Sequence, residues 1–164
     1  IRALIVTGVQ TCALPIWKWA GRLNAAGGRV IRELGLRAAT DVTGFGLGGH
    51  VLEMAAASKV AVELSLASIP FLSEAVELAG YGMLPAGSFA NKRYCSKDVA
   101  FASGLDPIRC DLVFDAQTSG GLVLAVPAAK VAAAREMLEA SGDLAAVIGR
   151  VTEMEDEKAR LRVV

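Results

Sequence analysis

The chain has 164 residues, of which 54% are hydrophobic, and its 17 lysines and arginines balance its 17 aspartates and glutamates. This length and apolar content suit one folded domain with a core and exclude global disorder. The net charge of zero argues against a general binder of nucleic acid or acidic membranes, and no apolar run reaches the roughly 18 residues of a membrane helix. We therefore expect a soluble, cytoplasmic protein.

The first residues give no structural signal. The chain starts at Ile1 rather than at methionine, which suggests a fragment, and its first 16 residues follow neither a helical nor a strand period. We set residues 1–19 apart from the domain, because the sequence suggests an unnatural N-terminal segment with a junction near Ala13–Trp17. The domain is predicted to occupy residues 20–164.

Hydrophobic periodicity predicts most of the following elements in chain order. The first half contains, in this order, a helix over 22–35 that ends at Gly35, a helix over 47–58, an alternating strand over 60–66 and a helix over 71–79. Residues 81–106 lack periodicity and predict a loop of about 25 residues, a length usual for functional or mobile loops. The second half contains a short helix over 108–114, a strand over 121–126, a helix from Pro127 to Ala140 and strands over 145–151 and 161–164, with a charged tip over 153–160.

This order predicts the α+β class, with helices covering a mixed, mainly antiparallel sheet.

A glycine-rich stretch, TDVTGFGLGGH, precedes the second helix and does not suit a packed core. Thr43 can cap this helix, and Gly44 and Gly46 would let the backbone approach a phosphate at the helix N-terminus. Asp41 would repel a phosphate unless a cation lay between them, and magnesium takes one or two carboxylates together with phosphate oxygens and water. Asp41 is therefore a candidate magnesium ligand. The alternative is that Asp41 caps the helix or forms a salt bridge.

A second polar turn, FDAQTSGGLVLAV, leads directly into a predicted strand. Its candidate site residues are Gln117, Thr118, Ser119, Gly120 and Gly121. They form either a second loop facing the same cleft as Asp41, Thr43 and Gly46, or an ordinary tight turn. Neither stretch is a Walker loop, because no lysine follows the glycines, and neither is a dinucleotide fingerprint, because GFGLGGH follows an acid rather than a predicted strand.

Other candidates have structural alternatives. His50 with Glu53 could form an acid–base pair or a structural hydrogen bond, and as the single histidine it excludes a multi-histidine metal site. Lys92 and Arg93 could meet phosphate or form a solvated pair. Three widely spaced cysteines, Cys12, Cys95 and Cys110, show no zinc or redox spacing, although Cys95 has basic neighbours that could activate it.

Several motifs in the same order resemble selenophosphate synthetase (selenide, water dikinase), in the C-terminal domain that it shares with aminoimidazole ribonucleotide synthetase. The motifs are ATDVTGFGLGGHVLEM, NKRY, LVFDAQTSGGLVLAV and AAVIGRV, between about Leu23 and Val151. The resemblance implies an enzyme that converts ATP, selenide and water to selenophosphate, AMP and phosphate with magnesium. It also implies that Asp41 is a magnesium ligand in a site completed by an N-terminal domain, which carries the ATP cradle and the reactive cysteine or selenocysteine.

The resemblance further implies a homodimer when full-length and a fragment that is inactive alone. Gly48 and Ala116 stand where the family usually has a bulky apolar residue and a proline, and we expect Gly48 to loosen the helix start and Ala116 to free the turn before Gln117. No cysteine here matches the nucleophile of the family. The alternatives are the C-terminal domain of another ATP-dependent enzyme of the superfamily, or a non-catalytic binding domain.

Overall fold

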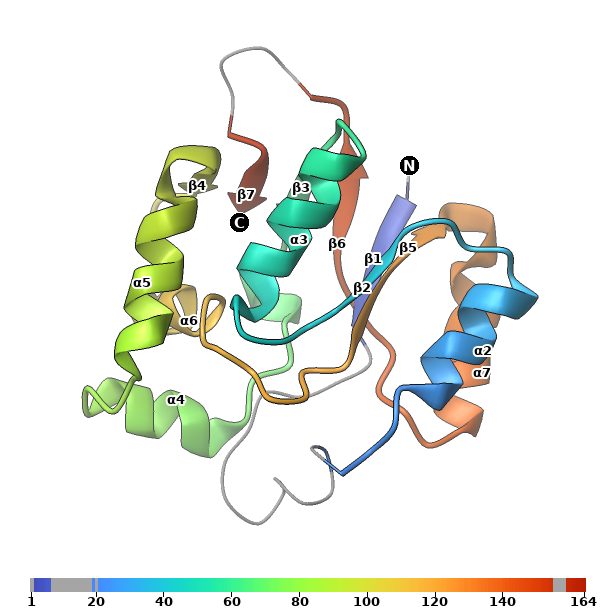
Figure 1. Ribbon diagram of the computed structural model, residues 1–164, viewed down its shortest axis with the longest axis horizontal. Helices are drawn as coiled ribbons and strands as arrows, with labels where there is room; N and C mark the ends of the chain where they lie inside the picture. The colour runs from blue at the N-terminus through green and yellow to red at the C-terminus, as the bar shows by residue number, and fades with distance from the viewer. Residues whose placement is uncertain (1, 7–18, 20, 155–158) are drawn as a thin grey trace.

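The computed structural model of the protein describes residues 2–6, 19, 21–154 and 159–164 (Figure 1). These residues contain a seven-stranded sheet with the strand order β2-β5-β1-β6-β3-β7-β4. The strands are β1 (Arg2–Val6), β2 (Ala39–Asp41), β3 (Ala61–Leu64), β4 (Val99–Phe101), β5 (Leu122–Pro127), β6 (Ala146–Thr152) and β7 (Leu161–Val163).

Strand pairing confirms the predicted fold class. Strand β1 pairs antiparallel with both β5 and β6, β2 pairs antiparallel with β5, and β3 pairs antiparallel with β6. Strand β7 is parallel to both β3 and β4. The sheet is therefore mixed and mainly antiparallel, and helices cover it as expected of an α+β domain.

The helices form a layer on each side of the sheet (Figure 1). Helices α2 (Ala25–Glu33) and α7 (Val131–Ala140) contact each other and β5. Helix α3 (Gly46–Ala57) contacts β2, β3, β7 and α5 (Ala86–Cys95), while α6 (Pro107–Leu112) contacts α5 and α4 (Ser73–Gly80). Short 3-10 turns occupy Leu66–Ser68, Ser96–Asp98 and Ala128–Lys130. None of the helices among the described residues is long and apolar enough to cross a membrane.

Two apolar cores lie on opposite faces of the sheet, and β1 contributes to both. Leu4 and Val6 pack into the core under α3, whereas Ile5 packs into the core under α2 and α7. Neighbouring residues of a strand point to opposite faces, which is why one strand can serve both cores. Leu4 and Ile5 are fully buried.

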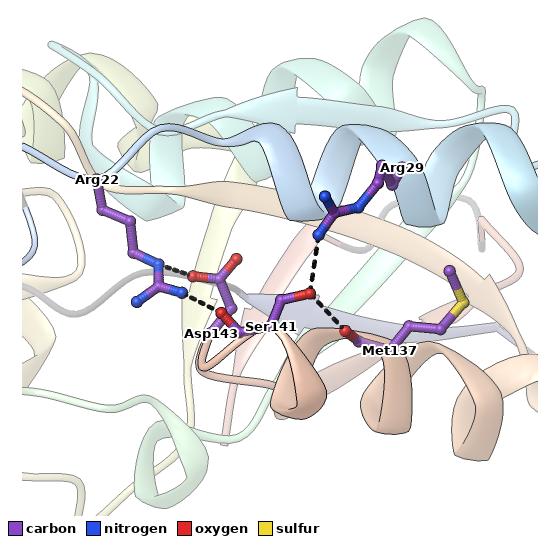
Figure 2. Close-up of polar contacts among 5 residues, drawn as sticks. All are labelled: Arg22, Arg29, Met137, Ser141 and Asp143. Atoms are coloured by element: carbon purple, nitrogen blue, oxygen red, sulfur yellow. Dashed lines mark hydrogen bonds and ion pairs between the residues drawn. The ribbon is translucent and has the colours of Figure 1, made fainter.

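A polar cluster joins the start of α2 to the end of α7 (Figure 2). The Arg22 guanidinium forms an ion pair with Asp143 and donates to the Ser141 carbonyl at 2.5 Å. The Ser141 hydroxyl accepts a hydrogen bond from Arg29 at 2.9 Å and donates to the Met137 carbonyl at 2.9 Å. The last carbonyls of a helix lack partners within it, so these bonds satisfy part of the α7 C-terminus.

The periodic segments were predicted correctly, with one large error. Helices α2, α3, α4, α6 and α7 and strands β3, β5, β6 and β7 match the predicted elements within a few residues. The predicted loop over 81–106 is wrong, because it contains α5 and β4. Helix α5 is weakly amphipathic, buries Ser88 and exposes Phe89 and Tyr94, so its apolar residues do not repeat at helical spacing.

Besides β4, two further strands were not predicted. Strand β1 is apolar on both faces and has no alternation, and β2 has only three residues. The suggested junction near Ala13–Trp17 lies outside the described residues. The domain boundary at residue 20 stays a prediction, but the sheet includes residues 2–6 on the other side of it.

Candidate functional site

The glycine-rich stretch is the connection between β2 and α3. Strand β2 ends at Asp41 and α3 begins at Gly46, so a strand does precede GFGLGGH, contrary to the prediction. Strand β2 pairs only antiparallel, with β5, which agrees with the absence of a dinucleotide-binding unit among the described residues. Gly46 has a φ of +68°, and a Cβ there would lie 2.6 Å from the Phe114 carbonyl carbon. Gly46 is thus required by the close approach of α3 to the second polar loop.

Backbone hydrogen bonds hold the two polar loops side by side. The Val42 amide donates to the Gly121 carbonyl at 2.9 Å, and the Gly120 amide donates back to the Val42 carbonyl at 2.9 Å. The Gln117 amide donates to the Thr43 carbonyl at 3.0 Å. The fold therefore brings the two predicted loops to the same edge of the sheet, where Asp41 lies opposite Leu122.

Asp41 is exposed, and its carboxylate makes no hydrogen bond or ion pair with any residue that the structure describes. The N-cap of α3 is Phe45, and no side chain accepts a capping hydrogen bond there. Within the described residues, the capping and salt-bridge alternatives for Asp41 are therefore not realised. A solvent-facing, unpaired carboxylate at the end of a strand is a donor that fits a magnesium ion.

Thr43 does not cap α3, contrary to the prediction. Its hydroxyl lies 3.0 Å from His50 Nε2, and His50 Nδ1 lies 3.2 Å from a carboxylate oxygen of Glu53. The His50 ring is buried and meets the ring of Phe45 edge-on, with the ring centroids 5.8 Å apart. His50 therefore links the β2–α3 connection to the body of α3, and Glu53, the neighbour that the sequence suggested, is its second polar partner.

The N-terminus of α3 is less open to phosphate than the sequence predicted. The Gly46 amide donates to the Thr43 carbonyl at 3.0 Å, and the Gly48 amide donates to the Val113 carbonyl at 2.8 Å. We expected Gly48 to loosen the helix start, but the structure shows a packing reason for this glycine. A Cβ at residue 48 would lie 2.6 Å from the Phe114 ring, so the missing side chain makes room for this fully buried aromatic.

The second loop turns one of its predicted site residues inward. Gln117 is buried, and its side-chain nitrogen Nε2 donates to the Asp115 carboxylate at 3.1 Å. Thr118 is exposed and Ser119 is half-buried, whereas Gly120 approaches Val42 so closely that a Cβ would lie 2.7 Å from a Val42 methyl group. Thr118 and Ser119 are therefore the side chains of this loop that remain available to a ligand.

Helix α5 contacts both loops, and sequence reasoning missed this because it treated the segment as a loop. Asn91 Nδ2 donates to the Gly44 carbonyl at 2.8 Å and to the Phe114 carbonyl at 3.2 Å. Lys92 is paired with Asp111 at 2.5 Å, and Arg93 is exposed. In the sequence, only the NKRY motif, which contains Asn91, pointed to a role for this segment.

The surface next to the loops is partly aromatic. Phe45 is 48% exposed and stacks on Tyr94, which is 78% exposed, with the ring centroids 6.5 Å apart. A cavity of about 690 Å³ lies elsewhere, at the other end of α3, where Met54, Ser58 and Val60 line it. That both loops face one ligand cleft therefore stays a prediction. Within the described part of the chain, no three His, Cys, Asp or Glu side chains are grouped so that they could hold a metal.

The cysteines with described positions are not reactive groups. Cys95 and Cys110 are free and buried. Burial raises the pKa of the Cys95 thiol above its ordinary value, and Glu53 and Asp98 raise it further. Burial likewise raises the pKa of Cys110, against an opposing effect of Lys92. The basic neighbours of Cys95 in the sequence therefore do not activate it. Cys12 lies outside the described residues.

Residues 25–162 match the family model described as AIR synthase related protein, C-terminal domain. The chain belongs to this family. It is 54% identical over 136 residues to a protein named selenide, water dikinase from Nitratidesulfovibrio vulgaris (strain DSM 19637 / Miyazaki F), covering 83% of this chain and 39% of that protein. It is 38% identical over 141 residues to selenide, water dikinase 2 from Peptoclostridium acidaminophilum, covering 85% of this chain and 40% of that protein. The chain thus spans about two fifths of these relatives, and the predicted resemblance is confirmed.

Solved structures share the fold at low sequence identity. A thiamine-monophosphate kinase from Stenotrophomonas maltophilia K279a matches with a TM-score of 0.64 and 19% identity, over 99% of this chain and 49% of that one. HypE from E. coli matches with a TM-score of 0.59 and 22% identity, over 99% of this chain and 46% of that one. These likenesses support the α+β fold of the family.

Proposed function

We propose that this chain is the C-terminal domain of an ATP-dependent selenophosphate synthetase, which forms selenophosphate, AMP and phosphate from ATP, selenide and water. Sequence identity of 54% to a selenide, water dikinase supports this assignment over other enzymes of the same fold. In this proposal the full-length enzyme is cytoplasmic and homodimeric. Its N-terminal domain supplies the nucleotide cradle and the reactive cysteine or selenocysteine.

The observation that carries the role of this domain is the Asp41 carboxylate at the junction of the two loops, which has no partner among the residues that the structure describes. When bound, magnesium would neutralise the charge of phosphate oxygens, and Asp41 would be this domain's ligand to it. Thr118 and Ser119 offer hydroxyl groups beside the same junction. Gly44 and Gly46 shape the backbone there, while Gln117, Gly120 and Gly121 hold the second loop against it.

The chain's own residues would therefore bind and orient rather than transfer protons or form a covalent bond. The side chains of Thr43 and His50 are hydrogen-bonded to each other, and the thiols of Cys95 and Cys110 are buried. The nucleophilic chemistry would lie in the N-terminal domain. The isolated chain is consequently expected to be inactive.

A chimera tests this proposal. Residues 25–162 would replace the corresponding segment of the Nitratidesulfovibrio vulgaris enzyme, and selenide-dependent formation of AMP would be measured at saturating magnesium. We expect activity within about tenfold of the parent enzyme, and no AMP formation by the isolated chain. A folded chimera without activity would contradict the proposed function, and activity of the isolated chain would contradict the division of labour between domains.

A further inference from the structure

Helix α5 carries two polar side chains that face the candidate site from one side. Ser88 and Asn91 are three residues apart, which places them on the same face of the helix. Ser88 is 2% exposed, and its hydroxyl donates to the Asp115 carboxylate at 2.5 Å. The other oxygen of this carboxylate accepts from Gln117 at 3.1 Å. Ser88 therefore reaches the second polar loop through Asp115.

Asn91 contacts both loops at once. Its amide nitrogen lies 2.8 Å from the Gly44 carbonyl, in the connection that follows Asp41, and 3.2 Å from the Phe114 carbonyl, at the start of the second loop. One –NH2 group has two protons, so it can satisfy both carbonyls simultaneously. Within the described part of the chain, backbone hydrogen bonds at Val42 and Thr43 also join the two loops.

We propose that Asn91 is a positioning residue that fixes the β2–α3 connection, which follows Asp41, against the second polar loop. This inference rests on the proposed function, because it assigns Asn91 a role in placing the magnesium ligand. The Asp41 carboxylate has no partner among the described residues, so its position depends on its backbone. That backbone pairs with Leu122 at the end of β2 and continues into the connection that Asn91 holds at Gly44. Small displacements of a reacting or ligating group cost large factors in rate, and Asn91 limits such displacement.

Two variants separate this role from general stability. Asn91→Asp keeps the side-chain shape but puts a negative oxygen against two carbonyl oxygens, and Asn91→Leu removes the donor without adding charge. The matched control is Gly87→Ala on the same helix, where an added Cβ would meet nothing within 4 Å. It changes the helix without touching either loop.

The first measurement is amide hydrogen exchange in the isolated chain. The amides of Gly46, Gln117 and Gly120 all donate to the Val42 and Thr43 carbonyls. We expect both Asn91 variants to accelerate their exchange at least about fivefold, the factor that corresponds to loss of one net hydrogen bond or more. Exchange in β1 and β6 should stay unchanged, and Gly87→Ala should alter neither group. Unchanged exchange in the loops would overturn the proposal.

The second measurement uses the chimera. The magnesium concentration for half-maximal activity should rise in both Asn91 variants while the KM for selenide stays constant, whereas a merely structural residue would lower only the amount of active protein. An unchanged magnesium requirement would overturn the positioning role. If the parent chimera is inactive, the proposed function fails, and hydrogen exchange alone decides whether Asn91 holds the loops together.

Discussion

Asp41 and Thr43 are two residues apart in the chain but differ in what binds them. Thr43 contacts His50 with its hydroxyl and accepts hydrogen bonds from Gly46 and Gln117 with its carbonyl. Asp41 has an exposed carboxylate without a partner among the described residues. A polar group whose bonds are all satisfied by the fold has a structural role, whereas an unpaired one can be removed at little cost to stability. This contrast makes the role of Asp41 testable.

Replacing Asp41 by asparagine in the chimera keeps the shape of the side chain and removes its charge. We expect the magnesium concentration for half-maximal activity to rise by at least roughly tenfold, the effect usual for residues that support a bound metal. The free energy of unfolding should stay within about 0.5 kcal/mol of the unmodified chain, as for exposed sites without partners.

Activity measured across a magnesium titration checks this expectation, and urea unfolding checks the fold. The control is Glu33→Gln, which removes one exposed negative charge on α2, a helix on the other side of the sheet from α3. If Asp41→Asn and Glu33→Gln behave alike in the titration, Asp41 is not a magnesium ligand.

The buried thiols predict a pH dependence of stability. The pKa values of Cys95 and Cys110 are raised in the folded protein above the ordinary value of 9.0, chiefly by burial. Folding therefore favours the neutral thiols. Their contribution to stability is fully present below the unfolded pKa, near 9, and is lost as the pH rises through the folded pKa values.

Urea unfolding between pH 8 and pH 10 would measure this effect. The unmodified chain should lose stability more steeply with pH than a variant with both Cys95→Ala and Cys110→Ala, which retains the other titrating groups. At pH 8 iodoacetamide should modify both thiols slowly in the folded state and rapidly in urea. Equal slopes and rapid modification of the folded chain would show that the thiols are accessible.

At the scale of elements, sequence periodicity predicted what a single amphipathic face determines. Helix α7 packs one apolar stripe against a core, and its apolar residues repeat at helical spacing. Strand β5 is buried on both faces, and its sequence is a continuous apolar run. Helix α5 escaped prediction because, apart from the buried Cys95, its contacts with the rest of the fold include polar ones, through buried Ser88 and half-buried Asn91. The Ser88 hydroxyl donates to a carboxylate and the Asn91 amide donates to carbonyls, all far away in the chain, and no local pattern reveals such partners.

The candidate site shows the same division. Asp41 and the QTSGG loop were identified by glycine and polar residues that do not suit a core, and the fold places the two segments together. The inward turn of Gln117 accompanies a backbone hydrogen bond to Thr43 in the other loop, and the hydrogen bond between Thr43 and His50 depends on the helical phase of α3. Local sequence patterns reveal neither.

The Arg22 cluster predicts how α2 and α7 are held together. Asp143 is buried, with a side chain 5% exposed, and its ion-pair partner Arg22 is 30% exposed. Arg22→Ala would leave the carboxylate without this partner and remove a hydrogen bond to the Ser141 carbonyl. We expect the free energy of unfolding to fall by about 1–3 kcal/mol, below the range for fully buried pairs because Arg22 is partly exposed.

The matched control is Arg135→Ala in α7. Arg135 pairs with Glu139 at 3.0 Å, and both side chains are about half exposed, at 51% and 54%. An exposed pair of this kind contributes about 0.5 kcal/mol or less. Urea unfolding followed by circular dichroism would compare the two variants, and equal losses would mean that the Arg22 cluster adds nothing beyond a surface pair.

At the scale of the whole molecule, β1 joins two cores that otherwise lie on opposite faces of the sheet. It lies between β5 and β6, and it precedes residues 25–162, which match the family model. Its sequence has no alternation because both faces are buried, and its partners are more than a hundred residues away in the chain. A pattern-based analysis therefore could not place it. The position of β1 implies that the two helical layers should lose stability together when β1 is weakened.

Ile5→Ala tests this implication. Ile5 is fully buried in the core under α2 and α7, and its truncation should lower the free energy of unfolding by about 2–4 kcal/mol through lost burial and a residual cavity. Val147→Ala is the control, because Val147 pairs with Ile5 on the neighbouring strand but is 38% exposed, so its truncation should cost less.

Amide exchange in the Ile5→Ala variant would show whether the two helical layers share the loss of stability. Because β1 also carries Leu4 and Val6 in the other core, exchange should accelerate in α3 as well as in α7. Acceleration confined to α7 would mean that the two layers unfold independently, and no change in either helix would mean that β1 does not support the sheet.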